Sequence, residues 1–182
     1  MNLNKKKILY WQIAAIIFTW ILGTLLHFTY EWSGENIAVG IFSAVNESTW
    51  EHLKLTFFPM LLFSIIEGIF LYKSSNNYIE AKTIGIFLSI FLIVTIFYTY
   101  TGILGTNFAF IDILTFLLSV IVSEYVSYRI LVTKEQSNII TKVLSIAIII
   151  FLLVCFIRFT FAPPKVQLFK DPINGTYGIL KE

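Results

Sequence analysis

Both histidines of the chain lie near acidic residues, in a pattern that could hold a metal ion. His27 and Glu31 are four residues apart, which places the two side chains on one face of a helix. His52 follows Glu51 directly, and Glu47 stands one helical turn before Glu51. Imidazole and carboxylate are both ligands of Zn²⁺. We therefore predict a zinc site at His27, Glu31 and His52, with Glu47 or Glu51 activating water.

Each of these residues also has a purely structural interpretation. An interfacial histidine such as His27 can simply hydrogen-bond to a neighbouring glutamate, and the spacing is not the His-Glu-x-x-His of zinc peptidases. Asp112 and Arg158 each lie about one turn inside an apolar segment, on the side of the histidines. They could place a substrate as a catalytic pair, or neutralise each other between two helices.

A second group of polar residues lies towards the other ends of the apolar segments. Glu67 and Glu124 stand at similar depth there, where they could relay protons or pair with Lys73 and Arg129. One segment also carries polar side chains at helical spacing, which we expect to face the bundle or a water-filled path: Asp112, Thr115, Ser119, Ser123 and Ser127.

The segments that must position these residues are those of a membrane protein. Of 182 residues, 57% are hydrophobic and 13% are charged, whereas soluble domains average about 45–50% apolar and about 25% charged residues. Spanning a bilayer takes about 20 apolar residues. The sequence predicts a single all-α membrane domain over 1–182 with five such helices, at 8–30, 53–72, 83–101, 108–131 and 139–162.

The connections between these helices are short, apart from one loop and the C-terminal tail. The loop 31–52 looks ordered, because Trp32 and Trp50 flank it and Ser48-x-x-Glu51 is a capping box that predicts a helix start near Ser48. The tail 163–182 begins with two prolines and is too polar to span. We expect it to lie as an extended strap over the face that carries the loop.

The positive-inside rule gives the orientation. With the N-terminus inside, the inner side holds eight basic residues: Lys5, Lys6, Lys7, Lys73, Lys82, Arg129, Lys134 and Lys142. The outer side holds five: Lys54, Arg158, Lys165, Lys170 and Lys181. We predict a multi-pass protein of the cell membrane with a cytoplasmic N-terminus and the C-terminus outside. The net charge of +2 argues against a nucleic-acid partner.

The loop and the tail resemble known families. The stretches 27–34 and 42–54, with Asp171-Pro172 and Gly175–Gly178 in the tail, resemble a bacterial family of small multi-pass membrane proteins of unknown function. A fainter likeness is to the alkaline ceramidases, through Glu31-Trp32 and Asn36. The chain departs from those enzymes at Gly34, in the place of an acid, and lacks the histidine pair of their last helix.

Three functions remain open on the sequence alone. The first is a membrane-embedded, metal-assisted hydrolase acting on a lipid or envelope substrate at the outer face. The second is a protein that binds or transports a small solute or ion, and the third is an accessory subunit that holds a membrane protein partner through the loop and tail. The sequence has no nucleotide-binding loop, dinucleotide motif or serine-hydrolase elbow, which argues against those activities.

Overall fold

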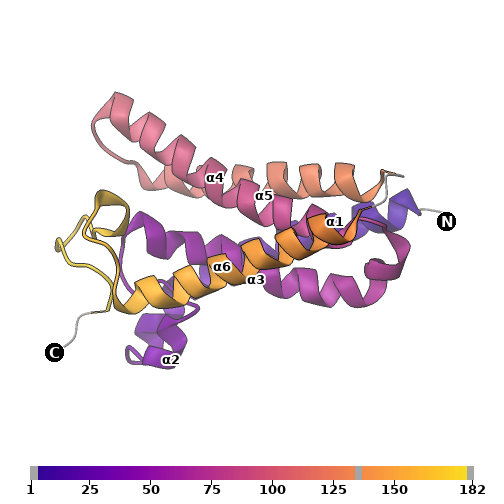
Figure 1. Ribbon diagram of the computed structural model, residues 1–182. Coiled ribbons are helices and arrows are strands. Elements are labelled where there is room, and N and C mark those ends of the chain that lie inside the picture. The colour runs from indigo at the N-terminus through magenta and orange to yellow at the C-terminus, as the bar shows by residue number, and fades with distance from the viewer. Residues whose placement is uncertain (1–3, 134–136, 180–182) are drawn as a thin grey trace.

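The structure, a computed structural model, is an all-α bundle that describes residues 4–133 and 137–179. Among these residues, five helices are long and apolar enough to cross a membrane. They are α1 (Lys5–Trp32), α3 (Thr49–Leu71), α4 (Tyr78–Leu104), α5 (Ala109–Leu131) and α6 (Ile139–Phe161). The five predicted helices are therefore confirmed, and Figure 1 shows them running along one long axis with the described ends of the chain at opposite ends. Lys134, Lys181 and Glu182 lie outside the described residues.

The bundle has two distinct ends. We call the end that carries the 33–48 loop and the tail the loop end, and the end where α1 begins the N-terminal end (Figure 1). The loop holds the short helix α2 (Ile37–Gly40), and the tail holds one turn of 3₁₀-helix, η2 (Gln167–Phe169). At the N-terminal end, η1 (Tyr72–Ser74) leads from α3 into α4.

Local sequence signals fix where the helices start and stop. The Ser48 hydroxyl accepts a hydrogen bond from the backbone N–H of Glu51 at 3.4 Å, so α3 begins where the capping box predicts. Asn36 and Asn138 cap α2 and α6 in the same way. Gly105 ends α4 in the left-handed conformation, with φ of 74°, which glycine adopts without steric cost.

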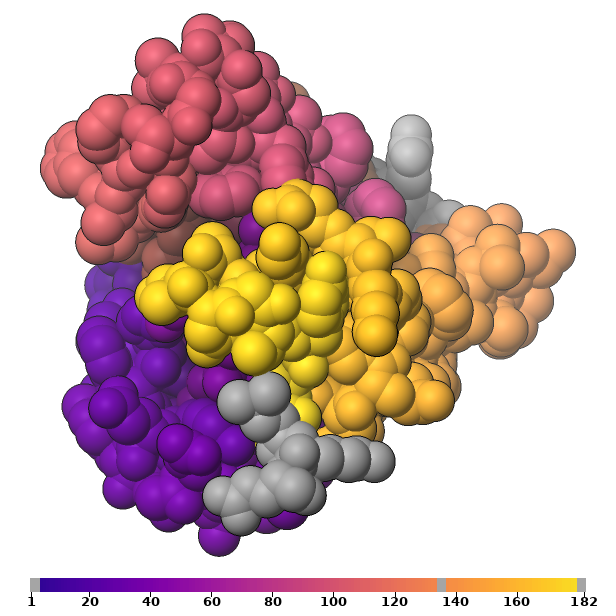
Figure 2. Space-filling model, turned by 90° about the vertical axis from the view of Figure 1, so that its left-hand side faces the viewer, coloured from indigo at the N-terminus to yellow at the C-terminus, as the bar shows by residue number. Residues whose placement is uncertain are grey.

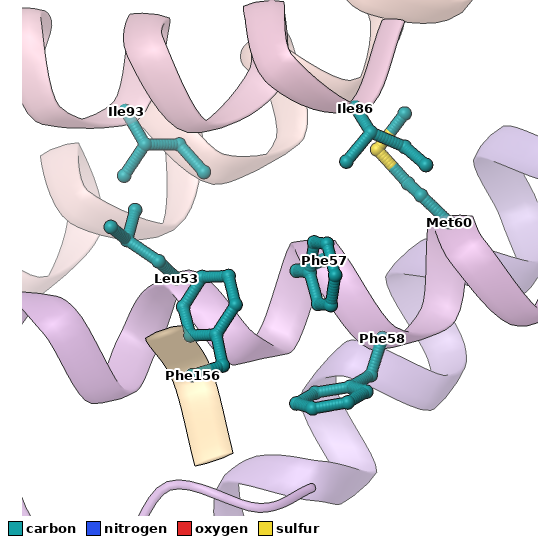
Figure 3. Close-up of a cluster of buried hydrophobic side chains, with 7 residues drawn as sticks. All are labelled: Leu53, Phe57, Phe58, Met60, Ile86, Ile93 and Phe156. Atoms are coloured by element: carbon teal, nitrogen blue, oxygen red, sulfur yellow. The ribbon is translucent and has the colours of Figure 1, made fainter. Parts of the chain in front are cut away.

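Helix α3 is the centre of the bundle. A cluster of buried side chains joins it to α4 and α6, as Figure 3 shows: Leu53, Phe57, Phe58 and Met60 from α3, Ile86 and Ile93 from α4, and Phe156 from α6. Helix α1 packs on the other side of α3, where Gly23 allows the two backbones to approach. A Cβ at Gly23 would overlap the carbonyl oxygen of Leu55.

The tail packs over the loop end. Trp50, in the first turn of α3, lies with its ring centroid 4.7 Å from that of Phe156 and 4.8 Å from that of Phe169 in η2. The Asn46 amide donates to the carbonyl oxygen of Gly178 at 3.1 Å, which ties the tail to the loop. Figure 2 looks onto this end and shows the tail in yellow between the loop and the α4–α5 connection.

Candidate functional site

Two histidines and one glutamate come together at the loop end. His27 lies in the last two turns of α1, Glu47 in the loop, and His52 in the first turn of α3. One ligand atom from each of the three side chains lies within 4.8 Å of the other two. We call this group the His–Glu cluster. Two imidazoles and one carboxylate form a ligand set that Zn²⁺ takes in catalytic sites.

Hydrogen bonds orient the His52 ring in this cluster. Its Nδ1 lies 2.9 Å from the carbonyl oxygen of Ser48, and a carbonyl can only accept, so Nδ1 is assigned as the protonated nitrogen. The other ring nitrogen, Nε2, lies 3.4 Å from the Glu47 carboxylate. The His27 ring lies beside it, with centroids 5.1 Å apart. Within the described part of the chain, the buried Nδ1 of His27 has no hydrogen-bond partner.

Glu51, predicted to activate water, does not lie in the His–Glu cluster but pairs with Lys54. Its carboxylate is 2.5 Å from the Lys54 ammonium, and both side chains are almost fully buried. It also accepts from the backbone N–H of Val45 at 3.2 Å. Lys54 in turn donates to the carbonyl oxygens of Gly40 and Ser43. This buried pair therefore fastens the loop to α3.

The other predicted site residues do not join the His–Glu cluster. Glu31 is exposed in the last turn of α1 and is not among the three clustered ligands. Asp112 accepts hydrogen bonds from the Tyr100 hydroxyl and, at 2.9 Å, from the Asn107 amide. Arg158 is exposed, and over residues 4–133 and 137–179 it forms no ion pair. The structure thus does not bring Asp112 and Arg158 together as a pair.

A second polar group lies inside the bundle, towards the N-terminal end. The Lys82 ammonium is 2.5 Å from the Glu67 carboxylate and 3.1 Å from that of Glu124. It also donates to the side-chain oxygen of Gln12 at 2.8 Å. We call these four residues the charge cluster. The partners Lys73 and Arg129 suggested by the sequence are not used by these carboxylates in the described structure.

Comparison with known proteins gives one family. The model of a family of unknown function, DUF6512, matches residues 1–179. The chain belongs to this family. No curated protein and no solved structure shows a significant match. The predicted resemblance to a family of unknown function is thereby confirmed, and the description of the family names no activity.

The His–Glu cluster and the charge cluster of this DUF6512 protein differ in their chemistry and in their depth. The His–Glu cluster is partly exposed at the loop end, so a metal ion and a substrate could both reach it. The charge cluster is buried between helices, where charged groups need partners. The sequence pointed to His27, Glu47 and His52 but not to Gln12, Lys54 or Lys82 as members of buried polar groups.

Proposed function

We propose that this membrane protein binds a divalent metal ion of the zinc class at its loop end, through His27, Glu47 and His52. The observation that carries the proposal is the convergence of three ligand atoms within 4.8 Å from three separate segments. The bond between His52 Nδ1 and the Ser48 carbonyl supports it, because metal-binding histidines are usually held by such a bond from the nitrogen that does not bind.

The set of three protein ligands also favours a chemical role. Catalytic zinc sites commonly have three protein ligands and leave a position for water or substrate. The chemistry that such an ion supplies is hydrolysis, by polarising the bond to be cut and by activating water. We propose a lipid or envelope ester or amide as the substrate class, reached from the outer face of the membrane. In this proposal Glu47 is a ligand of the ion, together with His27 and His52.

Metal content tests the binding proposal directly. The protein is purified in detergent with a tag that contains no histidine, incubated with Zn²⁺ and dialysed, and its metal is measured by mass spectrometry. We expect about one ion per chain in the wild type and a loss of at least tenfold in affinity for His27→Ala, His52→Ala and Glu47→Gln. Glu35→Gln, an exposed acid of the same loop, is the matched control and keeps the metal.

Binding of the metal ion should weaken at low pH. Metal-bound histidines must be neutral, so protons compete with the ion. We expect zinc affinity to fall as the pH is lowered, because protonation of the two imidazoles competes with the ion. A wild-type protein that takes up no zinc, or variants that retain it, would contradict the metal site. Bound zinc without hydrolysis of lipid esters or amides would leave metal binding intact and contradict the hydrolase role.

A further inference from the structure

The charge cluster is held by side chains from four helices. Gln12 comes from α1, Glu67 from α3, Lys82 from α4 and Glu124 from α5. Their exposures are 2%, 0%, 5% and 2%. The cluster is therefore a group of buried charged and amide side chains. The other buried side chains of the bundle are mostly apolar or carry a hydroxyl group.

The charges in this cluster do not balance. If every group is ionised, two carboxylates face one ammonium and leave a net charge of −1. The ammonium has three protons to donate, and Glu67, Glu124 and Gln12 already take them at 2.5, 3.1 and 2.8 Å. An uncompensated charge buried in low dielectric is costly, and such a group neutralises instead. One proton bound to a carboxyl group brings the cluster to zero net charge.

The two carboxyl groups differ in the hydrogen bonds that they accept. Glu67 accepts from the Gln12 amide through Oε1 at 2.5 Å and from Lys82 through Oε2 at 2.5 Å. The Tyr78 hydroxyl, 3.4 Å from Oε2, has its one proton directed at the Ser64 carbonyl oxygen at 2.6 Å, so Gln12 and Lys82 are the donors to Glu67. These donors stabilise its ionised form. Within residues 4–133 and 137–179, Glu124 accepts from Lys82 alone. Glu124 is therefore the less stabilised carboxylate of the two.

The groups around Glu124 come from three neighbouring helices. The charged or titratable groups that face it are Lys82 from α4 and Glu67 from α3, with Tyr78 behind Glu67, while α1 contributes the neutral Gln12. Arg129 on its own helix is exposed and bonded to Tyr125. A protonated carboxyl group donates a hydrogen bond. The buried hydroxyls of Ser123 and Ser127, which flank Glu124 on α5, have no partner among the described residues.

We propose that the two carboxyl groups of the charge cluster, Glu67 and Glu124, together bind one proton, which makes the cluster a proton-binding site of this membrane protein. Lys82 of the cluster also lines a groove on the bundle surface. An open groove of about 440 Å³, lined by side chains of α3, α4 and α6, reaches Lys82 and Tyr78. The proposal is independent of the metal site, which lies at the loop end.

Infrared spectroscopy of the purified protein at pH 7 tests this proposal. A protonated carboxyl group gives a C=O stretching band that shifts on transfer to D₂O. We expect this band in the wild type and its loss in Glu124→Gln. We also expect its loss in Glu67→Gln, because Glu124 and Lys82 then balance each other. In Lys82→Met no cation remains, so both carboxyl groups take a proton and the band grows about twofold, as the neutralisation rule requires.

The outcomes separate the proton site from a fully ionised ion-pair network. Glu35→Gln, an exposed loop acid, is the control and leaves the band unchanged. A wild-type spectrum without the band, or a band that survives in either glutamine variant, overturns the proposal. The wild-type measurement needs no substitution, and both glutamine variants keep the cluster neutral, so the test does not depend on whether Lys82→Met folds. Circular dichroism checks the helix content of each variant.

Discussion

At the scale of single residues, the pair Glu51–Lys54 shows how a membrane protein fixes a loop. Two opposite charges at 2.5 Å, almost fully buried, are costly to separate, because removing one partner leaves the other charge buried alone. Their remaining hydrogen bonds go to backbone atoms of Gly40, Ser43 and Val45. The pair thus holds the loop that carries Glu47, a proposed metal ligand.

This arrangement predicts a marked asymmetry between single and double variants. Glu51→Gln or Lys54→Met alone should lower the free energy of unfolding by about 3–5 kcal/mol, the usual cost of breaking a buried pair. The double variant should lose less than the sum of the two, because no unpaired charge remains. Thermal unfolding in detergent measures this, with the exposed Lys170→Met as control. Single variants as stable as the wild type would show that the pair does not hold the loop.

At the scale of helices, the contact between α1 and α3 depends on one glycine. A Cβ at Gly23 would overlap the Leu55 carbonyl oxygen and come within 2.9 Å of the Phe116 ring. Small residues allow such close helix packing in membranes. Gly23→Ala should therefore cost about 1–3 kcal/mol, as overpacking does, although alanine favours the helix. His27 is one turn away, so zinc affinity should fall in the same variant.

Gly102 provides the matched control for this substitution. It lies in the last turn of α4, and an added methyl group there would meet no atom within 4 Å. Gly102→Ala should be neutral or stabilising by up to about 1 kcal/mol, from helix propensity alone. Unfolding in detergent compares the two variants. Equal stability for Gly23→Ala and Gly102→Ala would contradict the close packing of α1 on α3.

The helices themselves were predictable, but the partners of their polar residues were not. Runs of about 20 apolar residues identify a spanning helix without any knowledge of the fold, and Ser48 marks the start of α3 through its cap. The sequence places Lys82 in an inner loop, because it predicts a helix from 83, whereas α4 begins at Tyr78. That earlier start buries Lys82 among α1, α3 and α5, where Glu67 is its partner.

The two histidines of the candidate site could be identified from the sequence, but the acid that joins them could not. His27 and His52 stand out because few histidines occur and acids lie nearby. Which acid joins them depends on how the loop returns over α1, and the sequence does not encode that path in any local signal. The loop brings Glu47 to the histidines, while Lys54 draws Glu51 into the interior. Spacing along a helix therefore favoured Glu31 as the acidic neighbour of His27, whereas in the fold Glu47 is the acid beside the two histidines.

At the scale of the whole molecule, the burial of two lysines changes the charge count behind the orientation. Lys54 and Lys82 are neutralised inside the bundle, so neither faces an aqueous side. The described basic residues that remain are six at the N-terminal end, Lys5, Lys6, Lys7, Lys73, Arg129 and Lys142, and three at the loop end, Arg158, Lys165 and Lys170. Over the full sequence, leaving out Lys54 and Lys82 changes the count from eight against five to seven against four. The excess of three basic residues on the side of the N-terminus is unchanged, so a cytoplasmic N-terminus stays the prediction.

Cysteine labelling tests this orientation, and with it the location of both proposed sites. Cys155 is the only cysteine, so Cys155→Ser gives a background without thiols. Asn76→Cys, between η1 and α4, and Val166→Cys, in the tail, then add one thiol at either end without changing the charge. In intact cells, a membrane-impermeant maleimide should label Val166→Cys but not Asn76→Cys, because positive residues favour the cytoplasmic side. After lysis both should react.

Labelling of Asn76→Cys in intact cells would reverse the orientation and place the His–Glu cluster in the cytoplasm, where an envelope substrate could not reach it.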